Sequence, residues 1–326
     1  MIIVTGGAGF IGSHVVHALN QRGETDILVV DNLTNGSKQR NLSSMRIGDY
    51  QDKADFLDRL PGVPWRRVQA VVHIGACSST TENDGRYMMR NNFEYSKVLM
   101  ERCQRQRVPF LYASSASVYG DGKNGFSEDL RCEAPLNVYA YSKFLFDQVV
   151  RRQLAAKTRS QVLGLRFFNV FGPQENHKGK MASVIFHFFQ QIQKDNEFKL
   201  FEGSERFLRD FVSVDDVVGI LIHFLDHPEI SGIFNAGTGQ ARSFEDLASA
   251  VHAHFPQAKK TYIPFPSELE GKYQTYTQAD LTRLRGQGKY EAPFADLKAS
   301  VGVYVELLSK TGGYLEPVGG ARQNQE

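Results

Sequence analysis

The chain has 326 residues, a length that suggests about two domains and a core that needs no disulfide or metal to be stable. Its 38 basic and 36 acidic side chains leave a formal net charge of +2, which argues against nucleic acid or an anionic membrane as the main partner. Because it has no membrane-length apolar run, no signal-peptide pattern and only three scattered cysteines, we expect a cytoplasmic globular enzyme with free thiols and no metal site.

Short apolar runs alternate with amphipathic stretches through the first half of the chain. The runs expected to form buried strands are Ile2–Thr5, Ile27–Val30, Ala70–Ile74, Phe110–Ser114 and Val162–Phe168. The segments expected to form helices between them are Phe10–Gln21, Asp52–Leu60, Tyr87–Gln106 and Tyr139–Leu154. Strand and helix in alternation predict right-handed crossovers and an α/β fold with a doubly wound parallel sheet.

The pattern changes after Asn169, where turns and phenylalanine-rich segments become frequent. The elements still readable there are a strand at Arg209–Val214, a helix at Asp215–Leu225 and a short strand at Ile233–Asn235. We therefore predict a first domain of residues 1–169, to which 210–238 return, and a smaller α/β substrate-binding lobe built from 170–209 and 239–309. Residues 310–326 lack an apolar period and are expected to form a flexible tail.

A glycine-rich turn, Thr5-Gly6-Gly7-Ala8-Gly9-Phe10-Ile11-Gly12, follows the first expected strand and opens the first expected helix. Its glycines permit a tight turn, a close approach to a pyrophosphate and packing of the helix on the sheet, and the helix N-terminus favours an anion. Asp31 ends the second strand about 20 residues later, which completes the dinucleotide fingerprint in its GxxGxxG spacing. The sheet is thus predicted to be a Rossmann-type, dinucleotide-binding one.

The choice between NAD and NADP stays open on these residues. Asp31 could accept hydrogen bonds from a ribose 2′-hydroxyl, which favours NAD. Asn32, Lys38 and Lys53 could instead hold a 2′-phosphate, although lysines on a polar loop are often only solvated. Composition leaves the two cofactors about even.

A second motif indicates acid–base chemistry. Ser115 lies just past the end of an expected strand, and Tyr139 and Lys143 are four residues apart, so they share one face of a helix. A phenol titrates near 10 and must lose about 3 pKa units, or about 4 kcal/mol, to act as a base at neutral pH. A neighbouring ammonium favours the phenolate, and Ser115 could orient the reacting hydroxyl. A YxxxK pattern alone arises often by chance, but together with the glycine turn it predicts a catalytic set.

These motifs resemble the extended short-chain dehydrogenase/reductase family, whose members mostly modify nucleotide sugars, over about residues 1–308. The resemblance implies that Ser115, Tyr139 and Lys143 form the catalytic triad and that Asn91 is the cofactor-side asparagine of the middle helix.

Longer matches are similar to the members of this family that epimerise ADP-heptose; they cover residues 75–81, 135–139, 177–183, 201–204 and 273–280. This similarity implies an isomerase that converts ADP-D-glycero-β-D-manno-heptose to its L-glycero epimer at C6″, supplying heptose for lipopolysaccharide. Hydride would leave C6″ to give a transient ketone and return to the opposite face. The similarity also implies a tightly held NADP, which favours NADP over NAD in the choice left open above. It further implies a homo-oligomer, which in this group is a pentamer.

The resemblance assigns the two acid/base groups to Tyr139 and Lys178; the alternative for Lys178 is a loop lysine that only binds diphosphate. It implies cofactor contacts from Gly6, Gly9, Phe10, Ile11, Gly12, Asp31, Asn32, Lys38, Lys53, Ile74, Gly75, Ala76, Cys77, Ser78, Asn91, Tyr139, Lys143, Val170 and Lys178. It implies substrate contacts from Ser115, Asn169, Lys180, His187, Phe201, Glu202, Gly203, Ser204, Arg209 and Tyr273.

Two positions depart from the family pattern, which has serine where this chain has Lys180 and a polar group where it has Ile74. The competing functions are a UDP-sugar 4-epimerase or another nucleotide-sugar reductase, a 4,6-dehydratase and a dinucleotide sensor. A dehydratase would carry acidic residues after Ser115, and a sensor would typically lose the YxxxK pair. Cys77 fits a structural cysteine better than a reactive thiol.

Overall fold

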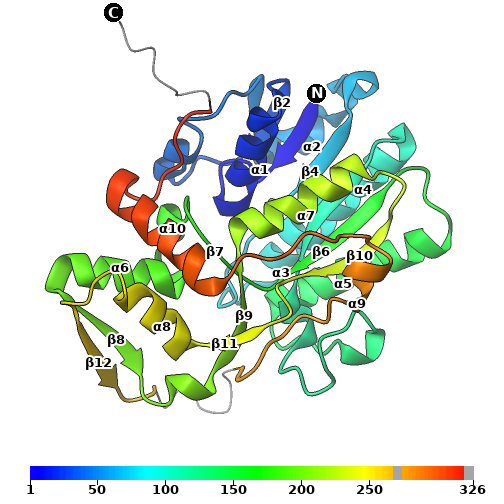
Figure 1. Cartoon of the computed structure of the whole chain (residues 1–326). Helices are drawn as coiled ribbons and strands as arrows, with labels where there is room; N and C mark the ends of the chain where they lie inside the picture. The colour runs from blue at the N-terminus through cyan, green and yellow to red at the C-terminus, as the bar shows by residue number, and fades with distance from the viewer. Residues whose placement is uncertain (267–273, 319–326) are drawn as a thin grey trace, which may run out of the picture.

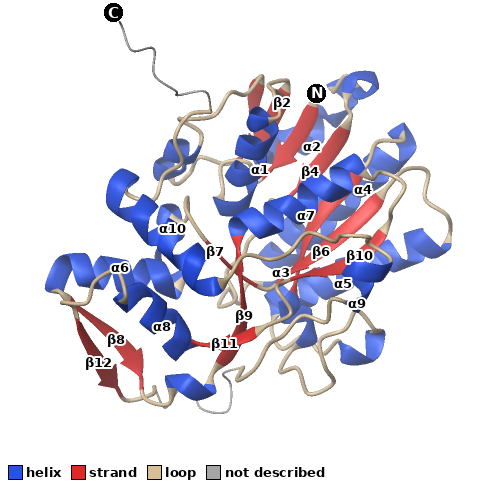
Figure 2. Ribbon diagram, in the orientation of Figure 1, coloured by secondary structure: helices blue, strands red, loops and turns tan. Residues whose placement is uncertain are grey.

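The computed structural model describes residues 1–266 and 274–318 and is built on a seven-stranded parallel sheet with the order β10-β6-β5-β4-β1-β2-β3 (Figures 1 and 2). Its strands are β1 (Ile2–Thr5), β2 (Ile27–Asp31), β3 (Asp49–Asp52), β4 (Ala70–His73), β5 (Phe110–Ser115), β6 (Val162–Phe167) and β10 (Gly232–Ala236). The strand order reverses on either side of β1, and such a switch point is where open α/β sheets bind ligands. The predicted Rossmann-type fold is confirmed.

Helices cover both faces of this sheet, which explains its nearly continuous apolar strands. One face packs against α1 (Phe10–Gln21) and α7 (Val214–Asp226). The other packs against α2 (Lys53–Arg59), α4 (Tyr95–Gln106) and α5 (Val138–Ala155). Successive side chains of β1 alternate between the two cores, with Val4 on the α1 side and Ile3 on the α5 side.

Two elements of the first domain differ from the sequence prediction. The edge strand β3 was missed because it is polar, Asp-Tyr-Gln-Asp, and buries no residue completely. The single helix expected at Tyr87–Gln106 is instead α3 (Gly85–Met88), a π-helical turn (Met89–Glu94) and then α4. Within that turn the Asn92 amide bonds both the N–H and the C=O of Cys77, at 2.8 and 2.9 Å, so a tertiary contact occupies the widened turn.

The remaining elements form a smaller lobe and its junction with the sheet (Figure 1). The lobe core joins α6 (Val184–Asp195), α8 (Phe244–His252) and α10 (Leu297–Thr311) to the parallel pair β8 (Glu197–Phe201) and β12 (Lys259–Ile263). A three-stranded sheet contains β7 (Asn169–Phe171), β9 (Leu208–Ser213) and β11 (Ala241–Ser243). The short helix α9 (Thr282–Gly286) packs beside β10, so this piece of 239–309 contacts the first domain. The division into domains remains a prediction.

Part of 310–318 contacts the rest of the molecule, although the sequence suggested a flexible tail from Lys310. The Gly313 carbonyl accepts a hydrogen bond from the Gln174 N–H at 2.7 Å, and the Arg40 guanidinium lies 3.9 Å from the centre of the Tyr314 ring. These are backbone and single-ring contacts, which leave no periodic pattern in the sequence.

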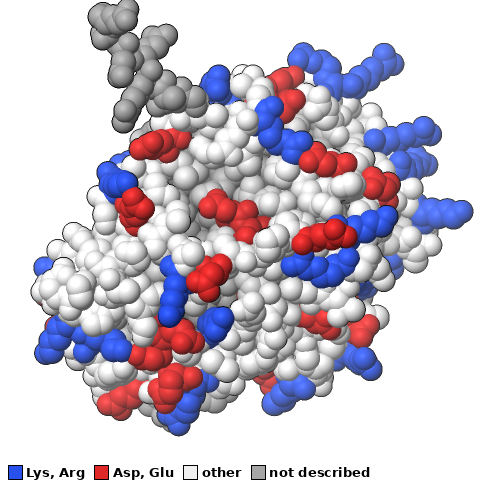
Figure 3. Space-filling model, viewed as in Figure 1, with Lys and Arg blue, Asp and Glu red and all other residues white. Residues whose placement is uncertain are grey.

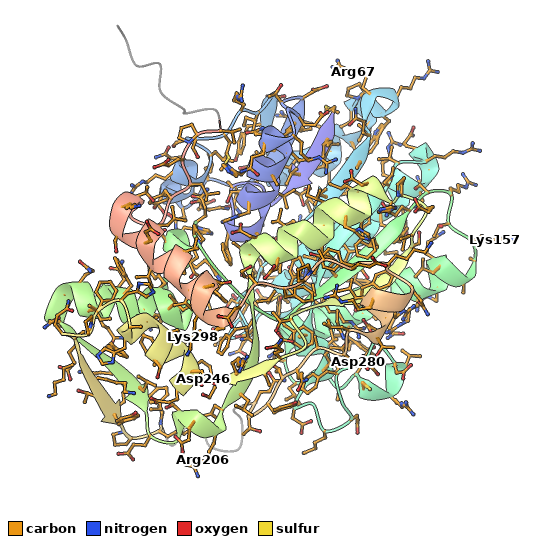
Figure 4. The ribbon with its side chains drawn as sticks, viewed as in Figure 1. Arg67, Lys157, Arg206, Asp246, Asp280 and Lys298 are labelled. Carbon is orange, nitrogen blue, oxygen red and sulfur yellow. The ribbon has the colours of Figure 1, made fainter. Side chains whose placement is uncertain are left out.

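The surface carries both signs of charge, interspersed over the face shown in Figure 3. Figure 4 shows side chains projecting from the first domain, such as Arg67 and Lys157, and from the lobe, such as Arg206 and Lys298. Within the two described ranges, no helix is long and apolar enough to cross a membrane.

We expect Phe146→Ala to lower the free energy of unfolding by about 3–5 kcal/mol, because it leaves a cavity under α5. Phe146 is 1% exposed and meets the Tyr112 ring edge-on at 4.8 Å. Urea titration measures the change, with Val98→Ala, at a 43% exposed position of α4, as the control expected within about 0.5 kcal/mol of wild type. A loss below about 1 kcal/mol for Phe146→Ala would show that this core relaxes around the missing ring.

Candidate active site

A cavity of about 580 Å³ opens at the carboxyl ends of the sheet strands. Its lining includes the last residues of β1, β2, β4, β5 and β6, which are Thr5, Asp31, His73, Ser115 and Phe167. Every cofactor contact expected from the sequence lies in this lining, and so do Ser115 and the other three expected catalytic residues. The structure therefore brings segments from residue 5 to residue 181 around one space.

The glycine turn is packed so closely that side chains at Gly6 and Gly12 would clash with neighbouring backbone. A Cβ atom on Gly12 would lie 2.0 Å from the Gly6 carbonyl oxygen, and one on Gly6, where φ is +71°, would lie 2.6 Å from the Gly75 nitrogen. Gly9 precedes α1 and offers no side-chain cap, so it leaves the first N–H groups of the helix open to a ligand. This geometry suits the pyrophosphate of a dinucleotide.

Acidic and basic groups are paired at the end of β2. The Asp31 carboxylate accepts hydrogen bonds from the N–H groups of Ala8 at 2.9 Å and Asn32 at 2.7 Å, and it forms an ion pair with Lys38. Lys53 donates to the Asn91 side chain at 2.9 Å. A ribose of either cofactor type would therefore meet one carboxylate and two amines here.

The YxxxK pair lies on the face of α5 that points into the cavity. Lys143 is 4% exposed and donates to the Ala113 carbonyl at 2.8 Å, and burial lowers its pKa to about 8, against the opposing effect of Asp147. Burial raises the pKa of the partly exposed Tyr139, while a hydrogen bond with Ser115 acts in the opposite direction. At neutral pH Lys143 is therefore mainly an ammonium, and a positive charge beside a phenol favours the phenolate.

Beneath this pair lies a buried ionic network that the sequence analysis missed. The Asp147 carboxylate accepts hydrogen bonds from Tyr112 at 2.8 Å, Ser114 at 3.0 Å and Arg166 at 2.9 and 3.0 Å. Arg166 also pairs with Glu133. The only sequence signal was an acidic residue four positions after Lys143, on the same helix face.

Lys178 belongs to the turn Asn176–Met181, which begins the passage into the lobe. Its amine lies 3.5 Å from the Glu175 carboxylate and 4.7 Å from the centre of the Phe10 ring, at the glycine turn. Glu175 is buried and also accepts hydrogen bonds from the Ser183 N–H at 2.7 Å and from Tyr304 of α10 at 2.8 Å. Lys178 thus lies near the N-terminus of α1, and its amine forms an ion pair with Glu175.

Most of the expected substrate residues lie away from this cavity. Lys180 is exposed beside it, and Asn169 is exposed on β7. In the lobe, His187 is on α6, Arg209 is buried on β9, and Phe201–Ser204 lead from the end of β8 into a turn. Tyr273 is outside the described residues. Among the described members of this group, Ser115 alone lines the cavity.

His73 is a cavity residue that the sequence analysis did not single out. Its Nδ1 lies 2.6 Å from the Thr5 hydroxyl and its Nε2 lies 2.8 Å from the Ser96 hydroxyl, and its ring stacks on Tyr95. Burial, with a contribution from the positive charge of Lys143, lowers the pKa of His73 to about 3, so the ring is neutral. A polar residue ending an otherwise apolar strand was the available signal. Further lining residues that we did not predict are Thr5, Val30, Ser79, Tyr87, Tyr95, Ala113, Ser114, Phe167, Phe168, His177 and Met181.

The chain is similar to known proteins over nearly its whole length. The ADP-L-glycero-D-manno-heptose-6-epimerase of Brachyspira hyodysenteriae is 55% identical over 318 residues, covering 97% of this chain and 100% of the relative. The enzyme of the same name from Alkalilimnicola ehrlichii is 53% identical, covering 95% and 98%.

Among solved structures, the ADP-L-glycero-D-manno-heptose-6-epimerase of Helicobacter pylori has a TM-score of 0.81 at 29% identity, covering 95% of this chain and 96% of that one. The UDP-glucose 4-epimerase of Thermotoga maritima, solved with UDP-glucose, also reaches 0.81, at 27% identity and coverage of 95% and 99%. The model of the NAD dependent epimerase/dehydratase family matches residues 2–237. The chain belongs to this family of epimerases and dehydratases.

Proposed function

We propose that this protein interconverts the D-glycero and L-glycero epimers of ADP-heptose at C6″, by transient oxidation and return of hydride to the opposite face. The observation that carries the proposal is the meeting of Ser115, Tyr139, Lys143 and Lys178 around the cavity that contains the glycine turn. The two relatives that match nearly the whole chain bear the name of this activity, which supports the substrate.

The residues divide the chemistry as follows. A bound nicotinamide supplies the hydride acceptor and donor. Tyr139, beside the Lys143 ammonium, exchanges the proton of the C6″ hydroxyl in one half-reaction, while Ser115 orients that oxygen. The second half-reaction addresses the other face of the same carbon and needs a second group, which is Lys178 in this proposal. Stereochemical inversion then follows from two proton-transfer groups that approach C6″ from different sides.

NADP is the proposed cofactor, and the substrate is proposed to reach into the lobe. Lys38 and Lys53 place two amines near the carboxyl end of β2, where a 2′-phosphate can replace their present partners. The nucleotide and sugar would be held by the substrate residues given above, with Arg209 as a guanidinium near a phosphate. A homo-oligomer is the proposed assembly.

We expect mass spectrometry of the small molecules released on denaturation to find NADP. Lys38→Ala should weaken NADP binding about 10- to 100-fold and NAD binding much less, because it removes a charge-assisted contact with the 2′-phosphate. Isothermal titration after cofactor removal measures both affinities, with Lys157→Ala, an exposed surface lysine, as the matched control (Figure 4). Equal losses of affinity for NADP and NAD would show that Lys38 stabilises its own turn and does not contact the 2′-phosphate.

We expect Tyr139→Phe and Lys178→Met each to lower the rate of ADP-heptose epimerisation at least about 100-fold, because each removes one acid/base group. Chromatographic separation of the epimers measures the rate, and Lys194→Met, at an exposed lysine in the last turn of α6, is the control. A near wild-type rate in Lys178→Met would reduce Lys178 to a phosphate ligand. Turnover of UDP-galactose but not ADP-heptose by the wild-type protein would replace the proposed function with a 4-epimerase.

A further inference from the structure

Two loops that are far apart in the sequence interlock at the edge of the cavity. One is the 3₁₀ turn Gly36–Asn41, which carries Lys38, and the other is the segment 174–178, which ends at Lys178. The Asn41 side chain donates to the Gln174 carbonyl at 3.1 Å, and the Gln174 side chain donates to the Asn41 carbonyl at 3.1 Å. Asn41 is 1% and Gln174 is 0% exposed, so water competes little for these bonds.

The backbone of Gln174 is held in an uncommon conformation. Its φ is +70°, a left-handed region that is unfavourable for a residue with a side chain and persists only where the surroundings enforce it. The enforcing contacts are the reciprocal pair with Asn41 and the hydrogen bond from its N–H to the Gly313 carbonyl. An unfavourable backbone conformation is thus maintained at Gln174, four residues before Lys178.

Asn41 extends the connection in two further directions. Its amide nitrogen also donates to the Ala8 carbonyl of the glycine turn at 3.0 Å and lies 3.2 Å from Nδ1 of His177. The nitrogen has two hydrogens for these three positions, so the contact with His177 is shared with the hydrogen bonds to the two carbonyls. Burial and the charges of Lys38 and Lys178 lower the pKa of His177 to about 4, so the ring is neutral at physiological pH.

We propose that Asn41 and Gln174 are positioning residues for Lys178, and that they tie the place of this lysine to the cofactor-binding turn. The inference rests on the proposed function and adds to it the means by which Lys178 is placed. The pair connects Ala8 of the glycine turn, the loop of Lys38 and the neighbour of Lys178 through side chains that touch no reacting atom. Loss of the pair would let the 174–178 segment move while Tyr139, on α5, stays in place.

The consequence is an asymmetry between the two half-reactions. A misplacement of about 1 Å in a reacting group can cost about 100-fold in rate. Breaking the pair should therefore slow the half-reaction that uses Lys178 and spare the one that uses Tyr139. A merely structural role would slow both half-reactions together, because general loosening affects every group in the site.

The experiment is rapid mixing of Asn41→Ala, saturated with NADP, with each ADP-heptose epimer separately, following the first appearance of reduced nicotinamide. Lys178→Met identifies which epimer depends on Lys178. We expect Asn41→Ala to slow that epimer about 10- to 100-fold and to leave the other unchanged. Ser43→Ala, an exposed position two residues along the same loop, is the matched control and should leave both rates unchanged.

Gln174→Gly is the second variant, since glycine adopts a positive φ without strain and the change removes only the other half of the pair. If the thermal unfolding midpoint shows that Asn41→Ala is not folded, the same rate measurements on Gln174→Gly test the proposal. Equal slowing of both epimers, or of neither, in a folded variant would overturn the proposal. If the wild-type protein forms reduced nicotinamide with neither epimer, it is the proposed function that fails.

Discussion

The carboxylate of Asp147, with no exposed surface on its side chain, is the fixed point around which the candidate site is arranged. A buried charge is tolerated only when its hydrogen-bonding capacity is filled, and here Tyr112 and Ser114 of β5 and Arg166 of β6 fill it. Each of those partners is fixed in the sheet, so the distance and rotation of α5 follow from the need to keep Asp147 paired.

The pairing of Asp147 also determines where Tyr139 and Lys143 lie, because all three residues are on α5. Lys143 and Tyr139 precede Asp147 by one and two turns on the same face of α5, so anchoring the acid places both groups over the end of β5. The charge matters as well as the position, because Asp147 opposes the lowering of the Lys143 pKa by burial. Arg166 balances the acid in turn and pairs with Glu133, so alternating charges stabilise a lysine that would otherwise be expensive to bury.

The parts of the site that could be predicted are those whose residues are close together in the sequence. The glycine turn and the YxxxK pair each occupy a short segment, and local backbone geometry alone makes them recognisable. His73, the Asp147–Arg166 pair and the Asn41–Gln174 pair join residues distant in sequence, and each member alone resembles an ordinary polar residue. In the fold, the apolar strands were predictable from their burial on both faces. The polar edge strand β3 and the three-residue strands β7 and β11 offered no such pattern.

Opposite charges are paired within the cavity, as they are balanced over the whole chain. Lys38 is paired with Asp31 and Lys178 with Glu175, so cations suited to phosphates are held without mutual repulsion. Each carboxylate is also held by a backbone N–H, Asp31 by Ala8 and Glu175 by Ser183. A lysine can therefore exchange its carboxylate for a phosphate while the acid stays bound and the turn keeps its shape. Since the acid still competes for the amine, a phosphate bound here would gain only the difference between two ion pairs.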